Sequence, residues 1–170
     1  MSLKVLTACI LLISFNAIAQ KNDENNPGAY ISGGIVPITL KAQTYSYDLG
    51  TTYPFFIGYN FNKNLSAEFM FASASTAKYI TTLNFSAVYL KPILPISNNA
   101  ELFARLGSNT MNLTTTYTNI TQRFASYGGG ATFYFADEKK GKYISIDYMV
   151  WGQEGTLSLV SPGVTFGMKF

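Results

Sequence analysis

The chain has 170 residues, a length suited to a single domain. Hydrophobic residues make up 48% of it and aromatic residues 15%, but charged residues only 12%, against roughly 25% in ordinary soluble domains. So few charges would cover a soluble surface poorly. After the N-terminal segment no apolar run reaches the roughly 18 residues of a transmembrane helix. A membrane β-barrel satisfies both observations, since its signal in each strand is weak.

Residues 1–19 have the features of a signal peptide that is removed on export. Lys4 supplies the positive charge, Val5–Phe15 the apolar stretch, and Ala17 to Ala19 the small-residue cleavage site. Without Lys4 the 12 basic residues fall to eleven against 9 acidic ones, a net charge of about +2. This excess is too small to indicate a nucleic-acid partner. The only cysteine, Cys9, lies in the same segment, so the mature chain is expected to form no disulfide.

A short polar lead, residues 20–29, precedes the region 30–170 that is predicted to fold. Tyr30–Leu40 is its first predicted strand, and the phase of this strand is ambiguous. Tyr30, Val36 and Ile38 compete with Ile31 and Ile35 for the outer face. The polar stretches Lys41–Thr52 and Thr110–Thr121 are interpreted as long loops.

Seven further segments alternate between apolar and polar residues with the period of a strand. They are Tyr53–Phe61, Leu65–Phe71, Tyr79–Lys91, Glu101–Asn109, Gln122–Phe135, Tyr143–Trp151 and Leu157–Phe170. Short turns at 62–64, 92–99 and 137–141 follow the second, fourth and sixth strands, and turns of this kind join antiparallel strands.

The more apolar side of each strand is expected to face lipid. In the fourth strand this side would be Leu83, Phe85, Ala87 and Tyr89, with Thr82, Asn84, Ser86 and Val88 facing inward. In the last strand it would be Val160, Pro162, Val164, Phe166, Met168 and Phe170. The alternation there continues to the final residue, whereas the ends of soluble domains tend to fray.

These features predict an all-β fold, an eight-stranded antiparallel up-and-down transmembrane β-barrel. In hydrocarbon every backbone N–H and C=O must be paired within the protein, so the sheet has to close. The competing interpretation is a soluble barrel of the lipocalin type, apolar inside and polar outside. The low content of charged residues argues against that alternative, because its exterior would need them.

Four charged residues are predicted to point into the barrel: Glu68, Arg105, Asp147 and Lys169. Glu68, Arg105 and Asp147 each lie three or four residues into a strand of the same direction, so they are expected at similar depth. Arg105 can bridge two carboxylates across a narrow lumen. The hypothesis is a polar plug formed by Glu68, Arg105 and Asp147. The alternative is four unrelated charges solvated in a wet interior.

The terminal VTFGMKF (Val164–Phe170), the LFARLG segment (Leu102–Gly107) and the eight-strand layout resemble small outer-membrane barrels of the OmpA-transmembrane-domain and OmpX type. The resemblance implies residence in the bacterial outer membrane, contact with its lipid, and delivery by the barrel-assembly machinery. It also implies that Val164, Phe166 and Phe170 form the assembly signal. Pro37 and Pro162 depart from the pattern, because they fall inside predicted strands and suggest bulges there.

No catalytic activity is expected. Several small outer-membrane barrels are enzymes that use a histidine base, and this chain has no histidine. A serine beside Asp147 or Glu154 alone would be a weak nucleophile system. No cofactor or metal site is predicted, and Gly128–Gly130 is interpreted as barrel packing. The expected role is structural or in surface contact with an unidentified extracellular partner; the alternative is a narrow pore for ions or small solutes.

Overall fold

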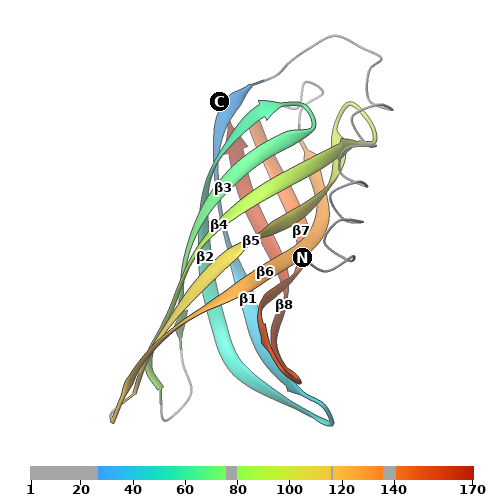
Figure 1. Ribbon diagram of the computed structural model, residues 1–170. Helices are drawn as coiled ribbons and strands as arrows, with labels where there is room; N and C mark the ends of the chain where they lie inside the picture. The colour runs from blue at the N-terminus through green and yellow to red at the C-terminus, as the bar shows by residue number, and fades with distance from the viewer. Residues whose placement is uncertain (1–26, 76–79, 116, 136–140) are drawn as a thin grey trace, which may run out of the picture.

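The computed structural model describes residues 27–75, 80–115, 117–135 and 141–170. The predicted signal peptide, most of the polar lead and most of the turn at 137–141 lie outside these residues. The described residues form eight antiparallel strands in a closed barrel, in which each strand pairs with the next and the last pairs with the first (Figure 1). The strands are β1 (Gly28–Ala42), β2 (Tyr45–Asn62), β3 (Leu65–Ser75), β4 (Ile80–Pro95), β5 (Ala100–Thr115), β6 (Asn119–Tyr134), β7 (Gly141–Glu154) and β8 (Leu157–Lys169). The predicted fold class is confirmed.

The two ends of the barrel differ. We call the end with Phe170 and the turn at Lys63–Asn64 the terminal end, and the end with the β1–β2 and β7–β8 turns the distal end. In Figure 1 the C-terminus lies at the upper end, and the β1–β2 and β5–β6 hairpins reach farthest toward the lower end. Among the described residues, no helix has both the length and the apolarity to cross a bilayer.

Most of the residues predicted to face lipid are exposed in the structure. In β2 the exposed residues alternate with buried neighbours, and they are Tyr53, Phe55, Ile57, Tyr59 and Phe61. The same alternation is found in β8 from Pro162 to Phe170. Val160, which is also predicted to face outward, is buried. The ambiguous phase of β1 is also settled: Tyr30, Val36 and Ile38 are buried, while Ile31 and Ile35 are exposed. A barrel that exposes apolar side chains and turns its glycines and charged residues inward has a surface suited to lipid rather than to water.

The prediction of two long loops is wrong. Of Lys41–Thr52 only Gln43 and Thr44 form a turn, and the flanking strands pair as far as Ala42 with Tyr45. Of Thr110–Thr121 the outer residues belong to β5 and β6, which pair as far as Thr114 with Asn119. These stretches are polar but rich in threonine and tyrosine, which favour strands. The 18 residues of β2 exceed the roughly 9–11 that cross a bilayer, so its polar part continues beyond the membrane.

The predicted phase of β4 is also wrong. Leu83, Phe85, Ala87 and Tyr89 are almost fully buried inside the barrel, and Thr82, Asn84 and Val88 are exposed on its surface. Both faces of β4 carry apolar residues, because its inward face supplies much of the apolar filling of the lumen. Hydrophobicity alone therefore does not distinguish the two faces.

The bulges predicted at Pro37 and Pro162 are absent from the pairing between β1 and β8, and the ladder is interrupted there instead. Ile35 pairs with Val164 and Thr39 with Val160, so the two prolines lie opposite each other at the β1–β8 seam. Proline has no backbone N–H to donate, and the ladder is interrupted here without a shift of register. The register shift near Pro37 lies in the pairing with β2, between Ile38 and Thr39, where Leu49 of β2 is the extra residue.

The corrected phase of β4 makes a prediction at Val88, which is 58% exposed and pairs with Phe69 of β3. Val88→Arg should lower the free energy of unfolding by about 2–4 kcal/mol, because it places a charge in hydrocarbon near the midplane. Phe69→Arg should cost a similar amount, and Val88→Leu should be neutral. The measurement is urea unfolding from liposomes. If Val88→Arg were as stable as the wild type, the result would support the sequence-based prediction that Val88 faces the lumen.

Candidate functional site: a charged cluster in the barrel lumen

The buried side chains of the lumen form three layers. The tyrosine layer, at the terminal end, consists of Tyr30, Tyr134 and Tyr143. The charged cluster, on the distal side of the tyrosine layer, consists of Glu68, Lys91, Arg105 and Asp147, all buried. The apolar layer extends from there toward the distal end and consists of Val36, Ile38, Phe56, Met70, Ala72, Leu83, Phe85, Ala87, Tyr89, Met149, Trp151 and Leu159.

Arg105 is the centre of the charged cluster. It lies on β5 and is 1% exposed. Its Nε donates to Oε2 of Glu68 on β3, and its Nη1 donates to Oδ2 of Asp147 on β7. Its Nη2 lies 3.4 Å from the other Glu68 oxygen. The planar guanidinium thus spans the lumen between two carboxylates, a geometry that a lysine ammonium cannot reproduce.

Lys91 and Tyr30 complete the coordination of Glu68. The Nζ of Lys91 on β4 lies 3.1 Å from Oε1 of Glu68, and the Tyr30 hydroxyl donates to the same oxygen at 2.7 Å. Two acids and two bases therefore lie together without net charge. A buried carboxylate needs partners of this kind, because an unpaired charge away from water is strongly destabilising.

Aromatic rings lie against both cations of the cluster. The Phe103 ring centroid lies 4.4 Å from the Lys91 Nζ and 4.7 Å from the Arg105 Cζ. The Phe56 ring centroid lies 4.5 Å from the Arg105 Cζ. Cations attract the negative faces of aromatic rings, and this attraction is strongest where water is excluded. The rings hold the cations in place and occupy space that water would otherwise fill.

Two glycines make room for the cluster. Gly58 on β2 lies beside Tyr30, and a Cβ on Gly58 would overlap the phenol ring. Gly163 on β8 lies beside Asp147, and a Cβ there would overlap the carboxylate. A large side chain next to a glycine is how a narrow barrel fills its interior.

The structure brings together three of the four lumen charges named from the sequence: Glu68, Arg105 and Asp147. Lys169, also buried, lies nearer the terminal end on β8, opposite Tyr30 of β1. Sequence reasoning missed Lys91, because the wrong phase of β4 turned it toward lipid. A lysine at the end of an otherwise apolar file was the available signal that this file faces inward.

The three residues of the predicted assembly signal lie on the outside of the barrel. Val164, Phe166 and Phe170 are all exposed on β8 or directly after it. Their side chains are placed to contact lipid. Among the described residues, no group of His, Cys, Asp and Glu has the arrangement of a metal site.

The contact between Gly58 and Tyr30 can be tested by mutation. Gly58→Ala should lower the free energy of unfolding by about 1–3 kcal/mol, because the added methyl displaces Tyr30 from Glu68. Gly33→Ala is the matched control, since the nearest atom to a Cβ there is 3.6 Å away. Combining Gly58→Ala with Tyr30→Ala should remove most of the Gly58→Ala penalty. Strictly additive losses in urea unfolding would show that the two residues do not interact.

A model of the outer membrane protein beta-barrel domain family matches residues 7–170. Among curated proteins, none matches this sequence.

Several solved barrels are similar in structure. Ail, the attachment invasion locus protein of Yersinia pestis, is 16% identical, with 84% of this chain and 99% of Ail covered and a TM-score of 0.61. Neisserial surface protein A is 15% identical over 84% of this chain and 97% of its own, with a TM-score of 0.60. OprG from Pseudomonas aeruginosa is 14% identical over 84% and 96%, with a TM-score of 0.54. At these identities the likeness concerns the fold. The family model, in contrast, spans nearly the whole sequence, and the protein therefore belongs to the outer membrane β-barrel domain family.

Proposed function

We propose that this protein is a bacterial outer-membrane barrel with a closed lumen, acting in membrane structure or surface contact and carrying out no catalysis. The observation that supports this most strongly is the filling of the lumen. Arg105 spans it between Glu68 and Asp147, with the tyrosine layer on one side and the apolar layer on the other. An eight-stranded barrel is just wide enough for side chains to fill it. The same observation disfavours the alternative of a narrow pore.

A role outside the membrane is supported by the distal hairpins. In barrels of this kind the longer projections face the outside of the cell. The β1–β2 and β5–β6 hairpins extend farthest at the distal end, which would place that end outside. The β1–β2 and β5–β6 hairpins project there as paired ribbons (Figure 1). They expose Tyr45, Tyr47 and Tyr117, and exposed tyrosines are common in contact surfaces because one end is apolar and the other polar.

The similar structures favour surface contact, but not one particular ligand. One structure of Ail is a complex with the heparin analogue sucrose octasulfate. A polyanion of that kind needs a cationic surface. The described part of the distal end offers Lys41 and Arg123 against Asp48 and Glu154. Two basic and two acidic side chains favour a partner surface that is uncharged or that carries charges of both signs.

The absence of catalysis is inferred from chemistry. The sequence contains no histidine, so a serine would have no imidazole base. The acids of the charged cluster are engaged by Arg105, Lys91 and Tyr30. These contacts serve packing and neutralisation rather than proton transfer to a substrate.

The closed lumen predicts the behaviour of Arg105→Ala. This change leaves Glu68 and Asp147 without their shared partner, and it should lower the free energy of unfolding by about 3–5 kcal/mol. It should also raise ion conductance in planar bilayers, because the side chain that spans the lumen is gone. Arg123→Ala, on an exposed arginine of β6, is the matched control and should change neither property. A wild-type protein that conducts as well as Arg105→Ala would favour the pore.

The assembly role of the last strand can be tested separately. Deleting Phe170 removes an exposed aromatic from the terminal end of β8, and with it the final residue of the proposed signal. The level of folded barrel in the outer membrane should fall, as measured by the heat-modifiable band of unboiled samples on a gel. Deleting Tyr117 from the distal end is the control. Equal levels of folded protein in both variants would contradict the assignment.

A further inference from the structure

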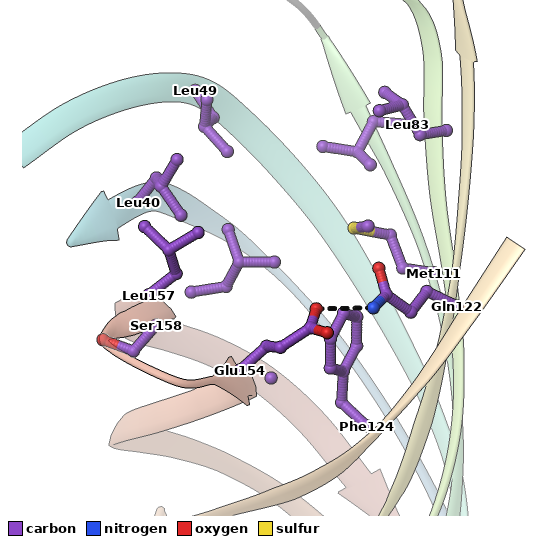
Figure 2. A pocket seen from close by; sticks show the side chains of 12 residues that line it. Leu40, Leu49, Leu83, Met111, Gln122, Phe124, Glu154, Leu157 and Ser158 are labelled. Carbon is purple, nitrogen blue, oxygen red and sulfur yellow. Dashed lines mark hydrogen bonds between the residues drawn. The ribbon is translucent and has the colours of Figure 1, made fainter. Parts of the chain in front are cut away.

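A pocket opens at the distal end of the barrel, on the distal side of the apolar layer. Figure 2 shows the side chains that line it. Its volume is about 280 Å³, close to the lower end of the range of about 300–1,000 Å³ for small-molecule sites. Its walls are mainly leucine and methionine side chains from strands on several sides of the barrel, among them Leu40, Leu49 and Met111. Figure 2 shows these side chains converging on a common space.

The pocket has a closed floor. Leu83 and Leu159 line it and also belong to the apolar layer. In that layer the rings of Phe85 and Trp151 pack edge to face with centroids 4.9 Å apart. The charged cluster lies deeper still. The pocket is therefore a blind site rather than the entrance to a channel.

Three polar side chains line the pocket, Gln122, Glu154 and Ser158, and two of them are in contact. Gln122 Nε2 donates to Glu154 Oε2 at 2.6 Å, beside Phe124 (Figure 2). Glu154 carries the only charge among the residues that line the pocket. A bound molecule would therefore meet hydrocarbon on most sides and a negative charge at one place. That distribution suits a molecule with an apolar body and a hydrogen-bond-donating or cationic head.

We propose that this pocket binds the single alkyl chain of a small amphiphile whose neutral or cationic head lies beside Glu154. The volume admits a short chain but no segment of folded protein. The hydrocarbon walls favour the chain, because burying it removes apolar surface from water. The carboxylate of Glu154 disfavours an anionic head by like-charge repulsion. This site lies apart from the charged cluster and does not depend on the role proposed for that cluster.

Methionine methyl groups provide a local probe of binding. Met111 lines the pocket, whereas Met168 is exposed on β8 near the terminal end. The protein would be labelled with ¹³C at the methionine methyls, placed in lipid nanodiscs, and titrated with octylamine, n-octanol and octanoate. The Met111 resonance should shift with saturation and the Met168 resonance should not. Octylamine should bind most tightly and octanoate most weakly.

Two variants and a control sharpen the test. Leu49→Trp fills the pocket from its wall and should weaken octylamine binding about tenfold or more. Leu94→Trp, on an exposed residue of β4 outside the pocket, should leave binding unchanged and controls for the added tryptophan. Glu154→Gln replaces the carboxylate with a neutral amide of the same shape, and it should abolish the preference for octylamine over octanoate.

Three results would overturn the proposal. One is a Met111 shift that grows without saturation in step with Met168, which would indicate partition into the bilayer. Another is unchanged octylamine affinity in a folded Leu49→Trp protein. The third is contact between the Met111 methyl and lipid-chain protons before any ligand is added, which would identify bilayer lipid as the occupant.

Discussion

The structure depends on charge compensation among side chains that are buried inside a narrow barrel. Closing eight strands removes every sheet edge from the hydrocarbon, but it leaves a lumen only wide enough for side chains. A charge pointing inward must then find its partner on another strand. Arg105 meets this requirement by contacting Glu68 and Asp147 at once, and Lys91 balances the remaining charge. One residue thereby ties β5 to β3 and β7 across the barrel.

The rest of the interior is arranged around this cluster. Gly58 and Gly163 omit side chains where Tyr30 and Asp147 need room, and Phe103 lies against both cations. On the distal side the filling becomes apolar and ends at the blind pocket. A single barrel thus combines a neutralised polar middle with an apolar distal part. The first supports the proposal of a closed lumen, and the second supports the proposal that the pocket binds the alkyl chain of a small amphiphile.

Much of the fold could be predicted from the sequence, because lipid enforces alternation wherever one face is apolar and the other is not. For this reason the faces of β2, and of β8 from Pro162 onward, agree with the prediction. The prediction failed at β4, where Phe85 packs in the lumen and Val88 meets lipid, so both faces are apolar. It failed again where the β1–β2 and β5–β6 hairpins continue beyond the membrane, since polar strands there carry no hydrophobic period. Lys91 was missed as a direct consequence of the first failure.

The most direct test of the account is the coupling between Glu68 and Arg105. A double-mutant cycle with Glu68→Ala and Arg105→Ala, measured by urea unfolding from liposomes, separates their interaction from the cost of each truncation. If the two residues neutralise each other in a lumen without water, the double variant should be more stable than the sum of the single losses implies, by about 2 kcal/mol or more. Losses that add within about 0.5 kcal/mol would show that solvent, and not Arg105, neutralises Glu68, and the closed lumen would be contradicted.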